Sequence, residues 1–298
     1  MAAQELVIGV DLGGTKILAG VVDRNGDVVR RREWRTPVES QDELLAALDR
    51  SVEELLDSGA VALGFSIPSV IDQRAGRALS SVNVPLHDLD FRTRMEARFD
   101  LPVGIDNDAN AAAFAEWRRG AGMDSATMVM LTLGTGVGGG LVLDGHMYRG
   151  WAEVGHTVVV HDGKPCPCGG RGHLESYCTG LAAEERAREV FGPAADAHRL
   201  VRLANEGDAQ AVAVLTEIGR VLGSGIGSVV NLFDAERVVI GGGFGVAAFD
   251  HLCGPALEVA RREALPPADE SLSIAKARLG TAAGVIGAGL IAFEALRR

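Results

Sequence analysis

Apolar residues recur in two nearly identical strand-turn-strand patterns. Residues 6–26 read LVIGVDLGGTKILAGVVDRNG, an apolar strand, a Gly-Gly-Thr turn and a second apolar strand ending in Asp and later Asn-Gly. Residues 128–145 read MVMLTLGTGVGGGLVLDG and repeat the order of strand, Gly/Thr turn and strand. Self-similarity at a separation of about 120 residues predicts two related lobes, with chance recurrence of a common hairpin pattern as the alternative.

Elsewhere the apolar spacing is typical of alternating helices and strands. Ser40-Gln41-Asp42-Glu43 is a capping box before apolar positions 44, 45, 48, 52, 55 and 56, which predicts an amphipathic helix. The same patterns predict strands at 61–67, 103–105 and 237–240, and helices at 109–117, 181–190, 209–231 and 282–296. This alternation predicts an α/β fold.

The two hairpin patterns also suggest how the chain is divided. We expect an N-terminal α/β lobe at residues 1–117, completed by a C-terminal helix at 282–298, and a C-terminal α/β lobe at 118–281. No low-complexity linker separates the halves, so a hinge is expected near residues 115–122.

Composition restricts the class of protein. The chain has 298 residues, 47% of them apolar, and its 29 basic and 40 acidic residues give a net charge of −11. Without a long Lys/Arg run, a nucleic-acid partner is disfavoured and a small-molecule partner is favoured. No run of about 18 apolar residues and no signal-peptide pattern occurs, so we expect a cytoplasmic protein without a membrane partner. Four cysteines in so long a chain indicate free thiols rather than a disulfide framework.

Residues 153–175, EVGHTVVVHDGKPCPCGGRGHLE, concentrate metal-binding side chains. His156, Cys166, Cys168 and His173 form a Cys2His2 donor set of the kind that binds structural Zn²⁺. Glu153 and Glu175 bracket the set and are not expected to be ligands. A surface loop with an incidental Cys-x-Cys is the alternative.

Three glycine-rich segments predict phosphate and nucleotide contacts. In DLGGTK, glycines permit close backbone approach, and the charged residues suit phosphate and hydrated Mg²⁺. Neither the P-loop nor the dinucleotide spacing is present in this segment. The predicted nucleotide-binding residues are Asp11, Gly13, Gly14, Thr15, Lys16, Gly134, Thr135, Gly136, Gly138, Gly241, Gly242 and Gly243. For each segment read alone, the alternative is a glycine-supported turn that binds nothing.

Asp108 has two interpretations. It follows the predicted strand 103–105 and opens a helix, so it is a candidate helix N-cap. A carboxylate at the end of a strand can also accept a proton from a substrate hydroxyl during phosphoryl transfer. The two roles are compatible.

Six ordered motifs resemble those of the ROK family of sugar kinases: DLGGTK, NDANAAAFAE, LGTGVGGG, EVGH, CPCGGRGHLE and VVIGGG. The resemblance covers nearly the whole chain and is strongest to bacterial ATP-dependent glucokinases. It implies an actin-like, ribonuclease H-like, two-lobed fold with duplicated hairpin phosphate motifs. It also implies transfer of the γ-phosphoryl group of ATP to the 6-hydroxyl of glucose, with Mg²⁺.

The resemblance also assigns residues. It implies that Asp108 is the base, that Zn²⁺ orients His156 toward the sugar, and that the sugar ligands are Asn83, Asn107, Asp108, Glu153, His156 and Glu175. We expect sugar and nucleotide as the small-molecule partners, and a homodimer or homotetramer. No helix-turn-helix domain is expected before the first motif.

Two positions depart from the family pattern. His173 stands where the family usually has a third cysteine, and we expect it to bind the metal in preference to Cys178. Ser69 stands where the family usually has glycine after proline, which leaves the hexose open. The alternatives are a kinase for N-acetylmannosamine, fructose or mannose, and a non-catalytic sugar sensor.

Overall fold

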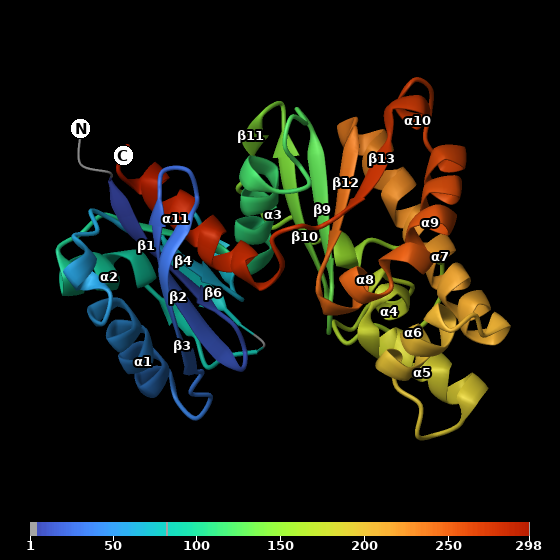
Figure 1. The fold of residues 1–298 in the computed structure, drawn as a ribbon, viewed down its shortest axis with the longest axis horizontal. Coiled ribbons are helices and arrows are strands. Elements are labelled where there is room, and N and C mark those ends of the chain that lie inside the picture. The colour runs from blue at the N-terminus through green and yellow to red at the C-terminus, as the bar shows by residue number, and fades with distance from the viewer. Residues whose placement is uncertain (1–4, 82, 298) are drawn as a thin grey trace. The chain divides into compact units, whose positions relative to one another are not determined.

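The chain divides into two compact units. The computed structural model describes residues 5–81 and 83–297 (Figure 1). The first unit contains the chain up to Arg119, the short segment Arg149–Trp151 and the chain from Thr281 onward; the second contains Gly120–Tyr148 and Ala152–Gly280. Each unit has its own five-stranded sheet.

The first unit is built on a sheet of order β3-β2-β1-β4-β8. These strands are β1 (Leu6–Leu12), β2 (Lys16–Asp23), β3 (Val28–Arg35), β4 (Leu63–Ile67) and β8 (Val103–Asn107). The first three are antiparallel neighbours, and β4 and β8 run parallel to β1. The expected strand 61–67 begins at residue 63, because Val61 donates its N–H to Leu6 outside the regular ladder.

A row of glycines across this sheet receives helix α11 (Ala283–Ala295). Gly9, Gly64 and Gly104 are register partners on β1, β4 and β8. A Cβ atom at Gly9 or Gly64 would overlap the α11 backbone, and one at Gly104 would lie 2.6 Å from the carbonyl oxygen of Ile291. The chain therefore needs glycine at these strand positions for its last helix to pack closely on the sheet (Figure 1).

The remaining elements of the first unit surround this sheet. Helix α1 (Gln41–Glu53) begins where the capping box predicts, with the Ser40 hydroxyl accepting from the N–H of Glu43 at 3.3 Å. The others are η1 (Leu56–Ser58), α2 (Phe91–Phe99), α3 (Asp108–Arg119) and a small sheet of β5 (Val70–Asp72), β6 (Arg77–Ser80) and β7 (His87–Leu89).

The second unit repeats the topology of the first. Its sheet has the order β11-β10-β9-β12-β13 and the same strand directions. These strands are β9 (Met128–Leu133), β10 (Val137–Leu143), β11 (His146–Met147), β12 (Arg237–Gly241) and β13 (Ser273–Lys276). The predicted duplication and α/β class are thereby confirmed.

Helices cover the second sheet, and two of them pack unusually closely. Helix α7 (Ala209–Phe233) lies on α9 (Phe249–Glu263), where a Cβ atom at Gly219 or Gly223 would lie 2.7 Å or 2.5 Å from an α9 carbonyl oxygen. The other short elements are η2 (Val154–His156), α4 (Glu175–Cys178), α5 (Gly180–Phe191), α6 (Ala197–Asn205), α8 (Gly243–Ala247), α10 (Ala268–Ser271) and η3 (Gly280–Ala282).

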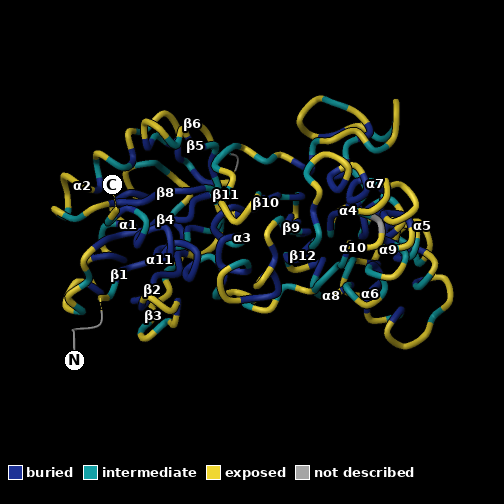
Figure 2. The backbone as a smooth tube through the Cα atoms, turned by 90° about the horizontal axis from the view of Figure 1, so that it is seen from above, coloured by how far each residue is buried: buried dark blue, intermediate teal, exposed yellow. Residues whose placement is uncertain are grey.

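Burial follows these layers. The central strands of both sheets are buried, whereas loops and outer helix faces are exposed (Figure 2). Among the described residues, α7 is the one helix whose length and composition would allow it to cross a membrane, and 56% of its most apolar stretch is buried within the protein. Its packing on α9 accounts for that apolarity as it would for the core helix of a globular unit.

Candidate functional site

The loop between β1 and β2 is fixed from the end of β3. Within it the Gly13 N–H donates to the Lys16 carbonyl at 2.9 Å. Thr36, almost fully buried, donates its hydroxyl to the Gly13 carbonyl at 2.7 Å and its N–H to the Thr15 carbonyl at 3.1 Å. The first predicted phosphate loop is thus held by one internal hydrogen bond and by two from Thr36, a supporting residue that the sequence pattern did not indicate.

Asp11 lies on β1 directly before that loop. Ser66, its register partner on β4, donates its hydroxyl to Asp11 Oδ1 at 2.7 Å. A Cβ atom at Gly284, in the first turn of α11, would overlap the Asp11 carboxyl group. Burial raises the pKa of Asp11 to about 6, and the Ser66 hydrogen bond opposes that rise. A carboxylate so placed would gain from a bound cation.

Lys16 and Asn83 lie near the same loop. The Lys16 ammonium is 3.2 Å from Glu33 Oε2, and both side chains are about half exposed, so this ion pair contributes little and is easily exchanged for a phosphate contact. Asn83 is exposed, and its Cβ lies 3.6 Å from the place that a Cβ on Gly14 would take. The structure therefore places Asn83 beside the first predicted phosphate loop.

Asn107 and Asp108 form the junction between β8 and α3. The Asn107 side chain accepts from the Ala109 N–H at 2.9 Å and donates to the Ser69 carbonyl at 3.2 Å. Asp108 is the first residue of α3, and its Oδ1 also accepts from the Ala109 N–H, at 2.9 Å. Asn107, rather than Asp108, therefore occupies the N-cap position.

Asp108 combines an exposed position with a perturbed carboxyl group. The residue as a whole is exposed, yet protein groups around the carboxylate partly desolvate it and raise its pKa, against hydrogen bonds that lower it. Such a carboxylate is accessible to a ligand and binds a proton more readily than an ordinary aspartate.

Ser69, the departure after Pro68, is directed into the small sheet. Its hydroxyl donates to the Ser80 carbonyl at 2.7 Å, and the residue is 4% exposed. Its own carbonyl accepts the Asn107 side chain. The additional hydroxyl is therefore used within the β5–β6 pair, while the backbone supports Asn107.

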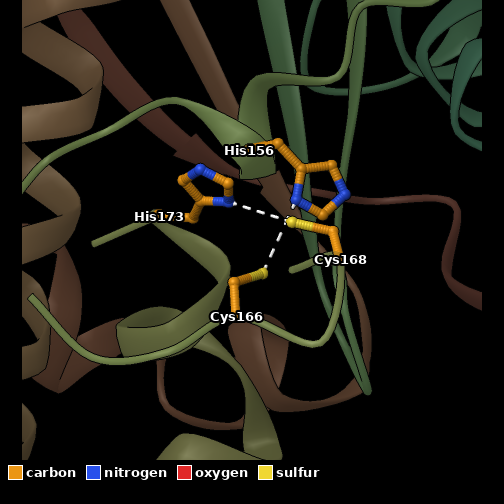
Figure 3. Close-up of side chains that lie close together, drawn as sticks. All are labelled: His156, Cys166, Cys168 and His173. Carbon is orange, nitrogen blue, oxygen red and sulfur yellow. Dashed lines mark hydrogen bonds between the residues drawn. The ribbon is translucent and has the colours of Figure 1, made fainter. Parts of the chain in front are cut away.

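The four predicted zinc ligands come together in the second unit. One ligand atom from each of His156, Cys166, Cys168 and His173 lies within 4.8 Å of all the others (Figure 3). Cys168 Sγ is 3.2 Å from His173 Nδ1, and Cys166 Sγ is 3.8 Å from His156 Nδ1. Tetrahedral Zn²⁺ with bonds of about 2.0 to 2.3 Å requires ligand separations of roughly 3.3 to 3.8 Å, so the set fits after a small contraction.

Cys178 is not a member of this cluster. It is fully buried in α4, where its thiol contacts the Ile218 carbonyl at 3.7 Å. Burial raises the pKa of Cys178, which disfavours the thiolate that a metal requires. Among the described residues, His173 is the donor that lies with His156, Cys166 and Cys168.

His156 presents its two ring nitrogens to different groups. Its Nδ1 faces Cys166, whereas its Nε2 is 4.0 Å from Glu153 Oε2. A metal bound through Nδ1 would leave Nε2 available on the side of Glu153. The imidazole can therefore serve a metal and a polar ligand at the same time.

Glu175 connects the second hairpin loop with the cysteine loop. Its Oε2 accepts from the Val137 N–H at 3.0 Å, and its Oε1 lies 3.8 Å from Cys166 Sγ. A Cβ atom at Gly136 would lie 2.7 Å from Oε2, so glycine permits this approach. The sequence indicated a sugar contact for Glu175, but not this hairpin contact.

The predicted nucleotide segments of the second unit meet at a pocket of about 500 Å³. This size is typical of small-molecule sites. It is lined by Gly134, Thr135, Gly180, Leu181, Glu184, Ala197, His198, Val201, Gly243, Phe244 and Ala247. The helix residues from α5 and α6 were not indicated by any sequence motif.

Not every predicted glycine lines that pocket. Gly242 has φ +78° and packs against the Leu133 backbone, and Gly241 packs against Met130. These two glycines shape the turn after β12. Gly138 lies on β10 opposite Thr132.

The predicted sugar and phosphate residues are distributed over both units.

Comparisons with known proteins agree with the motifs. The sequence profile of the ROK family matches residues 7–295. A glucokinase of Halalkalibacterium halodurans is 34% identical, with 95% of this chain and 93% of that protein covered. A ROK hexokinase from Thermus thermophilus has a TM-score of 0.85 at 35% identity, covering 98% of this chain and 99% of that one. A Streptomyces griseus ROK glucokinase, solved with glucose and AMPPNP, has a TM-score of 0.80 at 32% identity, covering 97% and 99%.

Proposed function

The chain belongs to the ROK family, and we propose that it transfers the γ-phosphoryl group of ATP to the 6-hydroxyl group of glucose. The observation that carries this proposal is the junction at Asn107 and Asp108, an exposed carboxylate of raised pKa beside an anchored amide. Similarity to a glucokinase that binds glucose and a nucleotide supports the choice of substrates.

In the proposed reaction, Asp108 accepts the proton of the sugar hydroxyl. The hydroxyl oxygen forms a bond to the γ-phosphorus, the bond from that phosphorus to the β,γ-bridging oxygen breaks, and ADP leaves. Because the pKa of Asp108 is raised, its carboxylate is a better proton acceptor than a fully solvated aspartate. Asn107, fixed by Ser69, provides an amide for a neighbouring hydroxyl.

The phosphate groups are assigned to the hairpin loops. The amides of both loops suit anionic oxygens, and Lys16 can exchange its surface partner for a phosphate. Asp11 would hold Mg²⁺ through its hydration shell, and that cation would neutralise charge on the transferred phosphoryl group. Burial raises the pKa of Asp11, so a bound cation would stabilise its ionised form.

The nucleoside is assigned to the pocket of the second unit. Apolar side chains of Leu181, Val201, Phe244 and Ala247 line it, together with the bare backbone at Gly134 and Gly243. Such a surface suits the faces of an adenine ring and a ribose.

The remaining sugar hydroxyls are assigned to Glu153, His156 and Glu175. One oxygen of Glu175 accepts the Val137 N–H, which leaves Oε1 as its contact for a hydroxyl. Zn²⁺ on His156, Cys166, Cys168 and His173 would fix the imidazole so that Nε2 is directed to the ligand side. The oligomeric state and the cytoplasmic location stay predictions.

A coupled assay across hexoses tests this function. Purified protein with ATP and Mg²⁺ should phosphorylate glucose with a higher kcat/KM than mannose, fructose or N-acetylmannosamine. Preference for one of the other sugars would replace glucose while retaining the kinase, whereas glucose binding without turnover would favour a sensor. Asp108→Asn protein, purified by the same procedure, controls for a contaminating kinase.

A further inference from the structure

We propose that the buried Asp106 and the partly exposed Arg149 form an ion pair that positions Asp108 for proton transfer. The inference rests on the proposed function, because it assigns positioning residues to the proposed base. Neither residue is among the predicted sugar or phosphate ligands.

Asp106 is held by donors from separate segments of the first unit. Its side chain is fully buried, and it accepts from Gln73 Nε2 at 2.8 Å, from Asn110 Nδ2 at 3.0 Å and from the Asn107 N–H at 2.8 Å. The Arg149 guanidinium donates to its other oxygen. A buried carboxylate is tolerated only with such a cation and a complete set of donors.

Arg149 is anchored on further sides. Its second guanidinium nitrogen donates to Glu294 on α11, and its guanidinium carbon lies 5.5 Å from the Phe114 ring centroid on α3. The segment Arg149–Trp151 groups with the first unit although the residues flanking it belong to the second. The planar fork of Arg149 therefore joins the end of β8 to α3 and α11.

This network controls the backbone from which Asp108 extends. The Asn107 N–H donates to Asp106, and the Asn107 side chain closes the helix end at Ala109. A displaced Asp106 would therefore move the first turn of α3 and with it the Asp108 carboxylate. A misplacement of about 1 Å can lower a rate by roughly 10²-fold.

The test uses Arg149→Lys and Gln73→Met. Lysine keeps the charge but not the fork, and methionine removes one neutral donor while leaving the ion pair. We expect kcat to fall by roughly 10- to 100-fold for Arg149→Lys and by roughly 3- to 10-fold for Gln73→Met. KM for ATP should stay within about twofold, because the predicted phosphate loops lie on other elements.

A matched control is available in the same unit. Arg94 on α2 donates from both guanidinium nitrogens to the Asp49 carboxylate on α1, at 2.8 Å for both hydrogen bonds, whereas Arg149 divides its two nitrogens between Asp106 and Glu294. Arg94→Lys likewise keeps the charge and loses a guanidinium fork, but away from the β8–α3 junction. Its kcat should stay within about twofold of wild type, even if its melting temperature falls.

The outcomes separate positioning from simple stabilisation. Circular dichroism identifies the folded variants, and if Arg149→Lys does not fold, Gln73→Met decides the matter. The proposal is overturned if folded variants keep kcat within about twofold of wild type, or if Arg94→Lys loses as much kcat as they do. An inactive wild-type protein would instead refute the proposed function.

Discussion

The two hairpins share a topology but differ in chemistry. In the first, Leu12 pairs with Ile17, so the connection contains Lys16; in the second, Leu133 pairs with Val137, and the connection is one residue shorter with no cation. Asp11 precedes the first loop by two residues, where the second hairpin has the neutral Thr132. The duplicated backbone has therefore acquired charge at one loop only.

The two loops also differ in how they are held. Thr36 fixes the first loop from its own sheet, whereas Glu175 fixes the second through the Val137 N–H. The second loop borders the apolar pocket, and Glu175 continues toward the cysteine loop. In the proposed function, one repeated frame would thus provide a charged phosphate loop in one unit and a nucleoside-contacting loop in the other, each with its own support.

The largest effect is expected at Asp108, in the first unit. Asp108→Asn should lower kcat by roughly 10²- to 10⁴-fold with sugar binding retained, because the amide cannot accept the proton. Asp208→Asn, an N-cap substitution at α7, should leave kcat unchanged. A kcat for Asp108→Asn within about threefold of wild type would remove Asp108 as the base.

Metal content tests the predicted zinc site, which would hold the His156 ring in the second unit. Metal analysis should find about one zinc per chain, and Cys168→Ser should lose it and raise the glucose KM by roughly tenfold through a disordered His156 ring. Cys253→Ser changes a thiol outside the cluster and should retain the zinc. Zinc-free wild-type protein with normal glucose affinity would contradict the assignment.

Asp11 should show a pH-dependent cost in stability that the second hairpin lacks. Its pKa is about 6 in the folded protein, above the usual 3.8, so its ionisation destabilises the fold as pH rises between about 4 and 6. Asp11→Asn should therefore raise the free energy of unfolding by about 1 to 3 kcal/mol at pH 7, with no gain below about pH 4.

Denaturant titrations across pH measure that difference, and Thr132→Val is the matched change in the second hairpin. It should show no such pH dependence. A destabilised Asp11→Asn at pH 7 would show that the Ser66 hydrogen bond outweighs desolvation. Asp11→Asn should also lose activity at low Mg²⁺, and this loss is separate from its effect on stability.

The smallest effect expected separates two roles of Glu175. Glu175→Gln keeps an oxygen for the Val137 N–H but loses charge at the sugar, so glucose binding should weaken by about 1 to 2 kcal/mol with the KM for ATP nearly unchanged. Glu153→Gln should likewise weaken glucose binding more than ATP binding. If only the ATP KM rises, or only stability falls, Glu175 serves the hairpin and not the sugar.

Sequence reasoning was most successful where the pattern is local. The hairpin repeats, the Ser40 cap of α1 and the α/β alternation follow from spacings of two to four residues and from turn glycines. The four Cys and His donors lie within 18 residues, from His156 to His173, so few loop conformations are needed to bring them together. The ROK motifs identified the family because each of them is also a short, local pattern.

Elements with weak periodicity were missed. Strand β3, VVRRREWR, is a charged edge strand, and α2, FRTRMEARF, buries only Phe91 and Met95. Edge position and scarce burial leave little apolar signal to read in either segment. Their identity depends on the neighbours against which they pack.

By itself the sequence determined the duplicated frame, the family and the local donor sets, because these depend on residues close together in the chain. Tertiary structure alone decided that Asp106 meets Arg149, 43 residues later, and that Glu175 reaches Val137, 38 residues earlier. It also placed Gly9, Gly64 and Gly104 in one row beneath α11. Contacts of this kind arise from strand register and packing between distant segments, which leave no periodic signal in the chain.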